Sequence, residues 1–216
     1  MSLAKLLQLA SPTLPVGAYS YSGGLEAACE AGVVSDAASA QRWIGDVLEW
    51  STVRMEAPIL LSFLSAFEKK DSKKVEKTNE IFLASRETAE LRAETVQMGY
   101  SLNRLLKDIG VGEVPVEEPS FPAAFAFAAA HWKIKPDDAL QAYLWAWLEN
   151  QVMAAVKAVP LGQTDGQRIL LSLGDRLSSV AEKAMSLKED DLGNFVPGLA
   201  MLSSKHETQY SRIFRS

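Results

Sequence analysis

The stretch that decides the fold is Pro136–Val156, PDDALQAYLWAWLENQVMAAV. Pro136 suits a first helical position, and the two aspartates that follow it suit the positive end of a helix dipole. Apolar side chains then recur every three or four residues, and Pro160 ends the pattern. The stretch is therefore predicted to form a long helix that packs on other helices.

Helical periodicity continues on both sides of this stretch, whereas the two-residue alternation of strands is almost absent. Further helices are predicted at residues 36–54, 59–67, 75–109 (with a possible break at 86–88), 121–132 and 164–185, and a short segment at 195–201. Residues 71–77 are expected to form an exposed turn, and residues 111–120 a loop. We predict an all-α, single-domain helical bundle of about seven to ten helices over residues 1–216.

Two long patterns also predict which side chains face the core. Trp50 and Ile81 fall on the apolar sides of their helices. The charged residues Glu87, Glu90, Arg92 and Glu94 are expected largely on the solvated side.

Composition limits the function classes. The 216 residues are 48% hydrophobic and carry a net charge of -5, without a basic stripe that would neutralise a phosphate backbone. The lone cysteine, Cys29, fits a reducing compartment. The N-terminus lacks a signal-peptide pattern, and the longest apolar stretch, Phe121–Trp132, is too short to span a bilayer. We therefore expect a cytoplasmic protein that binds neither nucleic acid nor membrane.

The N-terminal stretch Leu9–Glu26, LASPTLPVGAYSYSGGLE, raises the question of a phosphate site. A P-loop needs a lysine after its glycines, and a dinucleotide fingerprint needs a strand before them. Here Gly23-Gly24 is followed by leucine and glutamate, so nucleotide binding is rejected. Tyr19 and Tyr21 instead offer a large amphipathic area that suits a partner surface.

Catalytic and metal-binding patterns are weak. His131, His206 and Cys29 lack the spacing of a metal site, so His206, beside Glu207, is only a weak metal candidate. We expect a structural role for His131 and an inert thiol at Cys29. No nucleophile elbow is present, and no tightly bound cofactor is expected, so the sequence does not predict an enzyme.

Two other segments carry polar groups that helix packing does not require. The first, Val159–Leu171 (VPLGQTDGQRILL), joins two helices and presents Gln163, Gln167 and Arg168. It is either a hydrogen-bonded corner or the polar site of a helical metal- or small-molecule-binding enzyme, our alternative function. The second is the C-terminal tail, residues 204–216. Polar chain ends usually fray, yet this one contains tyrosine, phenylalanine and arginines, which are typical of interfaces.

Four blocks of the sequence resemble the UreF family of urease accessory proteins. The family patterns are LPVGxYSYSxGLE, SRExxELRxExxQMG, VPLGQTxGQRLL and HETQYSRLFRS. They match Leu14–Glu26, Ser85–Gly99, Val159–Leu171 and His206–Ser216, in the same order. The departures are Gly23, Asp165 and Ile213.

The resemblance implies an all-α, commonly homodimeric adaptor that is not an enzyme. Such proteins join UreD (also called UreH) to the GTPase UreG and couple GTP hydrolysis to nickel delivery into apo-urease. The resemblance also implies that the tail orders upon binding UreD and supports the tyrosine loop, Leu14–Gly24. The pairing arginine is Arg212 or Arg215, and its tyrosine is Tyr19 or Tyr21.

The partner-binding residues that we predict come from three of these blocks. They are Tyr19, Ser20, Tyr21, Glu26, Gln163, Gln167, Arg168, His206, Glu207, Tyr210, Arg212, Phe214 and Arg215. Arg168 and Arg212 are also candidates for an arginine finger that stimulates the GTPase. The alternative is gating, in which the chain restrains GTP hydrolysis until the complex is complete.

Overall fold

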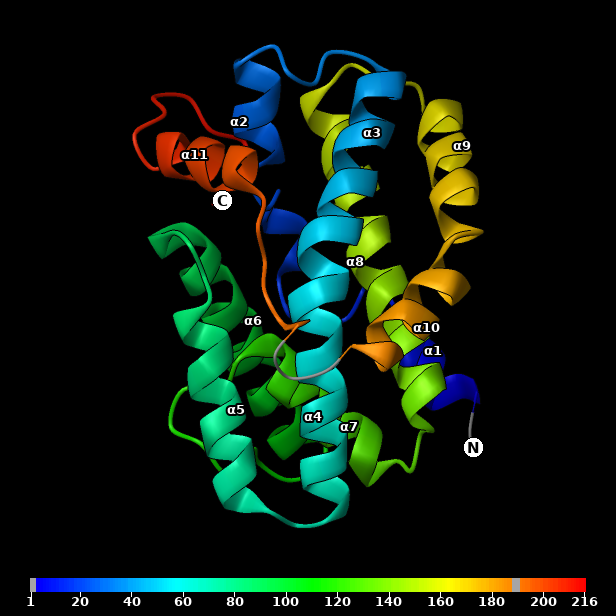
Figure 1. Cartoon of the computed structure of the whole chain (residues 1–216), viewed down its shortest axis with the longest axis vertical. Coiled ribbons are helices and arrows are strands. Elements are labelled where there is room, and N and C mark those ends of the chain that lie inside the picture. The colour runs from blue at the N-terminus through cyan, green and yellow to red at the C-terminus, as the bar shows by residue number, and fades with distance from the viewer. Residues whose placement is uncertain (1–2, 188–190) are drawn as a thin grey trace.

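The computed structural model describes residues 3–187 and 191–216, and every regular element in these ranges is a helix (Figure 1). The elements are α1 (Leu3–Ala10), the 3-10 turn η1 (Ala18–Ser20), α2 (Leu25–Glu30), α3 (Ala37–Val47), the π-helical segment η2 (Leu48–Glu56), α4 (Ala57–Glu68), α5 (Ser72–Ala84), α6 (Ala89–Asp108), α7 (Phe121–His131), α8 (Pro136–Ala158), α9 (Gln163–Gly174), α10 (Leu177–Ser186) and α11 (Pro197–His206). The predicted all-α bundle is confirmed. Across the described ranges, no helix has the length and apolar character needed to cross a membrane.

Elements α3, η2 and α4 form one continuous helix along the long axis of the molecule (Figure 1). Asp36 begins it with a reciprocal capping box, because its carboxylate accepts from Ser39 N at 2.7 Å. Two separate helices were predicted here, and that prediction is wrong. Ala57 N donates to the carbonyl of Thr52 five residues earlier, so π-helical turns carry the chain past Pro58 without a break.

The π-helical segment changes which side chains face outward. A wider turn rotates the faces of the helix, and Trp50, predicted in the core, is 48% exposed. Its ring lies 4.5 Å from the Arg54 guanidinium. Ile81 of α5 was also predicted on the apolar face and is exposed instead.

Helices α5 and α6 are separated by the predicted break. Asp71 caps α5 by accepting from Lys74 N, so most of the predicted exposed turn at residues 71–77 is already helical. Thr88 caps α6 through Leu91 N at 3.2 Å. Gly110 ends α6 with a φ of 76°, and the predicted loop follows it.

The core is centred on α7 and α8. The buried side of α7 consists mostly of alanines, which let α4 and α6 approach it closely. Helix α8 runs through the middle of the molecule and contacts α1, α2, α3, α4, α9 and α10. Both helices follow the sequence prediction.

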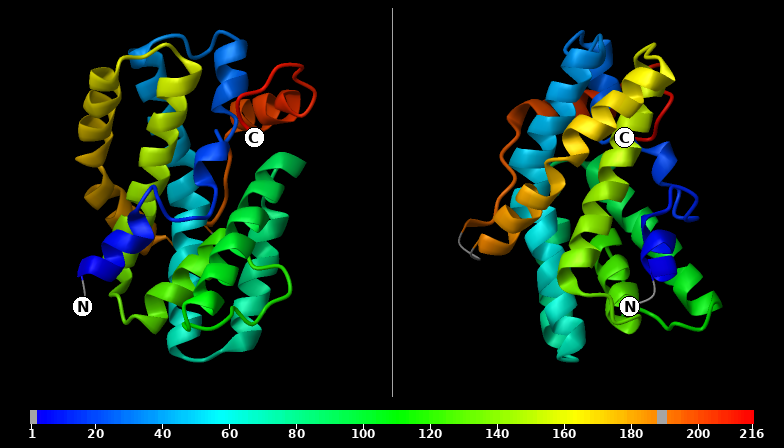
Figure 2. Two further views of the ribbon diagram at one scale, coloured as in Figure 1. Left: turned by 180° about the vertical axis from the view of Figure 1, so that it is seen from behind. Right: turned by 90° about the vertical axis from the view of Figure 1, so that its right-hand side faces the viewer.

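The C-terminal quarter differs from the prediction in two ways. The single helix predicted at residues 164–185 is two helices, α9 and α10, which separate at Asp175 and Arg176. Arg176 and Lys183 reach Glu49 of η2 at 3.0 and 2.7 Å, and these contacts hold α10 against the long helix. The predicted short segment at residues 195–201 is the start of α11, which packs on α2 (Figure 2). The sequence has an acidic run at residues 189–191, of which 189 and 190 lie outside the described residues.

Candidate functional site

The tail folds back onto the tyrosine loop, so the two ends of the sequence meet. Arg215 N donates to the carbonyl of Ser20 at 2.8 Å, and Ser22 N donates to the carbonyl of Ser216 at 3.1 Å. Gly24, which has a φ of 82°, lets α11 approach the start of α2, because a Cβ there would lie 2.8 Å from Leu199 Cδ1 of α11. The candidate site is this junction of loop, tail and α6.

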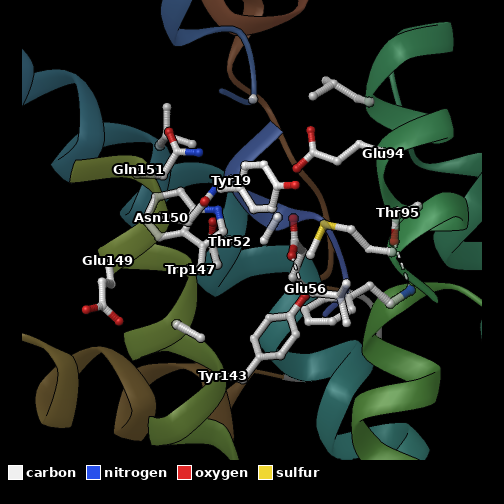
Figure 3. Close-up of a pocket in the computed structure, with 18 of the residues that line it drawn as sticks. Tyr19, Thr52, Glu56, Glu94, Thr95, Tyr143, Trp147, Glu149, Asn150 and Gln151 are labelled. Atoms are coloured by element: carbon white, nitrogen blue, oxygen red, sulfur yellow. Dashed lines mark hydrogen bonds between the residues drawn. The ribbon is translucent and has the colours of Figure 1, made fainter. Parts of the chain in front are cut away.

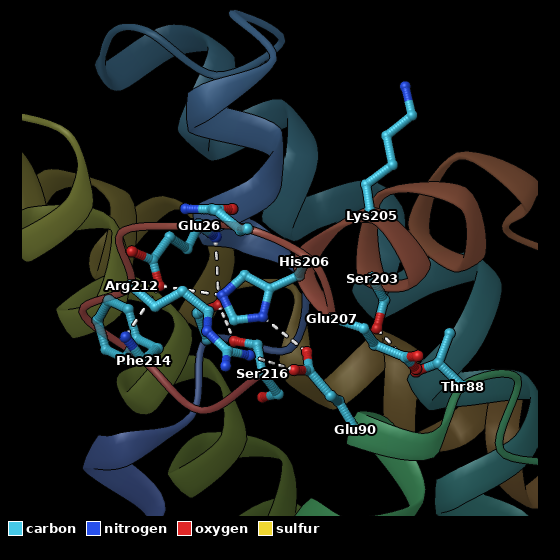
Figure 4. Close-up of polar contacts among 12 residues, drawn as sticks. Glu26, Thr88, Glu90, Ser203, Lys205, His206, Glu207, Arg212, Phe214 and Ser216 are labelled. Carbon is cyan, nitrogen blue, oxygen red and sulfur yellow. Dashed lines mark hydrogen bonds and ion pairs between the residues drawn. The ribbon is translucent and has the colours of Figure 1, made fainter.

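Glu26, at the start of α2, binds the tail through three hydrogen bonds. Its carboxylate accepts from the backbone N of Ile213 at 2.7 Å and from that of Phe214 at 2.8 Å. It also lies 3.1 Å from Nε2 of His206 (Figure 4). Glu26 is itself buried, so these bonds replace the water that a carboxylate would otherwise bind. The sequence marked Glu26 as a partner-binding residue, and the structure turns it towards the chain's own tail.

His206 was predicted on a polar tail, but it is completely buried at the end of α11. Its Nδ1 lies 2.6 Å from Glu90 of α6, while Nε2 faces Glu26. Both ring nitrogens are therefore occupied by carboxylates and neither is free to bind a metal in this conformation. Among the described residues, no group of three or more His, Cys, Asp or Glu side chains could hold a metal ion.

Two glutamates of α6 were predicted on its solvated side, and this prediction is wrong for both. Glu90 accepts from Arg212 at 2.7 Å as well as contacting His206. Glu94 accepts from the Ser216 hydroxyl at 2.7 Å, and burial raises its pKa to about 7. The tail covers this side of α6, which periodicity within α6 could not reveal.

The structure also separates the two tyrosines that the sequence left open. Tyr21 is buried and its hydroxyl donates to Gln97 of α6, to which Arg215 also donates. Burial raises the pKa of Tyr21, and the nearby Arg215 opposes that shift. Tyr19 is 67% exposed, and Lys157 of α8 lies 5.8 Å from its ring. Thus Tyr21 shares a partner with Arg215.

The remaining tail side chains divide into an inner and an outer set. Phe214 is buried, with the Lys157 ammonium 5.6 Å from its ring. Glu207 is exposed and accepts from Ala89 N at the start of α6. Tyr210 and Ile213 are exposed and apolar or aromatic, and Arg212 and Arg215 are exposed cations beside them. Ser20 is half-buried and contributes its carbonyl.

The predicted corner at the start of α9 is not part of this junction. Gln163, Gln167 and Arg168 are exposed, and α9 and α11 lie on opposite sides of the molecule (Figures 1 and 2). Arg168 pairs with Asp165 at 3.0 Å. The corner is therefore a solvated helix start, and its geometry does not support an enclosed enzymatic site.

A cavity of about 270 Å³ lies between the tyrosine loop, η2, α6 and α8 (Figure 3). Inside it, Glu56 accepts from the Tyr143 hydroxyl at 2.7 Å and pairs with Arg86 at 3.0 Å. Motif spacing in the sequence does not reveal these three residues, because Glu56 lies in η2, Arg86 lies between α5 and α6, and Tyr143 lies in α8.

Two further residues were considered from the sequence, Cys29 and His131. Burial raises the pKa of the Cys29 thiol to about 11, which leaves it unreactive as a nucleophile. His131 is exposed at the end of α7, so the expected structural role is not supported. Neither residue belongs to the junction.

Comparison with known proteins then identifies the family. The sequence model described as UreF matches residues 34–174. The chain belongs to the UreF family. It is 58% identical to the urease accessory protein UreF of Azoarcus sp. (strain BH72), over all of this chain and 96% of that protein. It is 51% identical to the UreF of Dechloromonas aromatica (strain RCB), over all of this chain and 98% of that protein.

Three residues of the junction come from one of the sequence blocks that resemble the UreF family. Glu90, Glu94 and Gln97 all lie in the Ser85–Gly99 block that carried the resemblance, at spacings that share one side of a helix. This spacing is the signal in the sequence that could have marked Glu90, Glu94 and Gln97 as one group. Their contact with the tail required the three-dimensional structure.

Proposed function

We propose that this chain is a non-enzymatic adaptor in urease maturation, which bridges UreD/UreH and the GTPase UreG and couples GTP hydrolysis to nickel insertion into apo-urease. Nickel is the cargo of the complex in this proposal, and the adaptor acts in the cytoplasm as a homodimer. The names of its relatives support a urease accessory role. The polar groups of the junction hydrogen-bond to one another and hold the tail in place. This arrangement supports an adaptor, because an enzyme would direct such groups at a substrate.

The observation that carries the proposal is the division of the tail into inner and outer side chains. Glu26, Glu90 and Glu94 hold the tail in place through polar bonds. Tyr210 is fully exposed and Ile213 is 67% exposed. Aromatic and arginine side chains that are fixed on a rigid surface are typical of interface anchors. We propose that these outer side chains contact the partner proteins.

The first experiment measures capture of UreD/UreH and UreG by immobilised chain. The double substitution Tyr210→Ala with Ile213→Ser removes outer contacts and keeps the residues that hold the tail. We expect capture of at least one partner to fall about tenfold or more, since buried interface anchors are commonly worth that much. The matched control, Tyr100→Ala with Ile109→Ser, changes exposed residues of similar type on and just after α6.

Unchanged capture of both partners by the tail variant would show that the outer tail is not an interface. The adaptor role itself has a separate test. Cells that lack the chain are expected to accumulate nickel-poor urease, and normal nickel loading there would contradict the role. Purified chain should also turn over no nucleotide and retain no metal through gel filtration.

A further inference from the structure

The hydrogen bonding of His206 requires a particular protonation state. Its two ring nitrogens lie 2.6 Å and 3.1 Å from carboxylate oxygens of Glu90 and Glu26. An ionised carboxylate only accepts hydrogen bonds, and a neutral imidazole has only one N–H. A neutral ring would therefore direct a lone pair at a carboxylate in a site closed to water. Both nitrogens must carry protons to satisfy both contacts.

The surrounding charges agree with a protonated ring. Glu26 of α2 and Glu90 of α6 supply two negative charges, and Arg212 supplies one positive charge at 2.7 Å from Glu90. The imidazolium supplies the second positive charge and balances the cluster. Cys29 of α2 lies near Glu26, and its thiol is kept neutral by burial.

Other ionisable groups lie nearby without touching the ring. Glu94, one turn further along α6, bonds to Ser216 instead. The two charged neighbours of His206 in the sequence, Lys205 and Glu207, are exposed, and Lys205 points away from the cluster (Figure 4).

The same cluster holds the tail. The Glu26 carboxylate that faces the imidazolium also accepts from the backbone N of Ile213 and Phe214. Loss of the proton leaves two buried carboxylates with a single neighbouring cation and a ring lone pair aimed at one of them. Uncompensated buried charge is strongly unfavourable, and release of the tail lets water reach the carboxylates.

We propose that a single proton on His206 latches the tail to the body of the protein, so that the tail docks when the proton is bound and is released when it leaves. This inference concerns the tail itself and does not depend on which partner the tail meets. It extends the proposed function, because the outer side chains that we assign to partner contact are presented only while the latch is closed.

The first experiment is nuclear magnetic resonance on the full chain, whose only two histidines are His131 and His206. The exposed His131 lies outside the cluster and provides a comparison ring in the same spectrum. At about pH 8 we expect nitrogen shifts of a doubly protonated ring for His206. A neutral His206 ring in a chain whose tail is still docked would overturn the proposal.

The second measurement is hydrogen exchange at the amides of Ile213 and Phe214, corrected for the intrinsic effect of pH. Above about pH 8.5, Glu94 is almost fully ionised and contributes little further change, because its pKa is about 7. If release of the tail is coupled to the loss of one proton, the protection of both amides should then fall about tenfold for each unit by which the pH rises. The amide of Leu148, buried in α8, reports whether the whole chain opens instead.

Two matched variants separate a proton latch from a merely structural contact. Glu90→Gln places an amide opposite Nδ1, and an amide can satisfy a neutral ring, so the tenfold dependence on pH should disappear even if docking is weaker. Glu207→Gln changes the adjacent residue, which does not touch the ring, and should keep the dependence. Equal dependence on pH in the Glu90→Gln variant and the parent, or no dependence in the parent, would overturn the proposal.

Discussion

At the residue scale, Glu94 shows how a single contact changes the chemistry of a side chain. It lies on a helix surface that looks solvated in the sequence, yet the tail covers it and Ser216 is its bonded partner. Burial is the main reason that its pKa rises from 4.5 to about 7, and the nearby Glu56 and Glu90 add to the rise. Arg86 and the Ser216 hydroxyl oppose it.

This shift predicts a dependence of stability on pH. Below about pH 4.5 the carboxyl is protonated in both folded and unfolded chains and costs nothing. As pH rises towards 7 the unfolded chain ionises first, so the free energy of unfolding falls by about 3 kcal/mol through this group. Glu94→Gln removes that loss and still offers an acceptor to Ser216. Urea denaturation at about pH 5 and about pH 8 checks the prediction.

The contradicting outcome is a parallel pH dependence in the Glu94→Gln variant and the parent. It would show that the carboxyl is hydrated in solution and that the tail does not cover it. Glu207→Gln serves as the control, because Glu207 is exposed and its variant should follow the parent.

At the element scale, the close approach of α6 and α7 sets the position of the glutamates that bind the tail. Gly99 makes this approach possible, since a Cβ at that position would lie 2.0 Å from the carbonyl oxygen of Pro119 and 2.9 Å from Phe121 N. Both neighbours are backbone atoms, one in the connection before α7 and one at its first residue, so no side chain can simply rotate away. The close packing of α6 on α7 therefore depends on the absence of a side chain at residue 99.

Gly99→Ala is accordingly predicted to destabilise the protein although alanine is the better helix former. Overpacking against backbone costs about 1–3 kcal/mol and exceeds the gain of up to about 1 kcal/mol in helix propensity. Gly174→Ala is the control, because its Cβ would meet only a ring atom of Trp145 at 3.4 Å. Urea midpoints measure both. A Gly99→Ala variant as stable as the parent would show that the two helices are free to separate.

At the scale of the whole molecule, the two arginines considered as GTPase fingers are on different sides. Arg168 belongs to α9 and Arg212 to the tail beside α11, which lie on opposite sides of the bundle (Figure 1). One GTPase active site is therefore expected to receive only one of them. The Arg168 side chain is the freer of the two to reach a partner. It is 73% exposed, and reaching out would break only its ion pair with Asp165 at the surface. Arg212 instead neutralises the partly buried Glu90.

Single-turnover GTP hydrolysis by UreG in the assembled complex distinguishes a finger from gating. If the chain supplies a finger, Arg168→Ala should slow hydrolysis about 10³-fold, whereas Arg212→Ala should act mainly by loosening the tail. Arg168→Lys is the matched control for charge, and it should not restore the rate because a finger uses the planar guanidinium. A small change or a gain in rate with Arg168→Ala would instead favour gating.

The sequence by itself determined the class of fold and most of the helices. Apolar periodicity, the cap at Asp36, the break near Thr88 and Pro136 are local signals, so they can be recognised without knowledge of packing. Four sequence blocks were also enough to indicate the family. Local signals failed in η2, where the helix changed its hydrogen-bond pattern, and at Asp175, where the predicted single helix divides into α9 and α10.

Only the tertiary structure decided the nature of the candidate site. The sequence marked Glu26 and His206 but placed His206 in solvent, and it left Glu90 and Glu94 on a wet face. Their burial arises because residues 180 positions apart are brought together when the tail packs between α2 and α6. Periodicity within one helix reports only its own two sides. The charge and protonation of a side chain depend on what covers it, and here the covering segment comes from the other end of the chain.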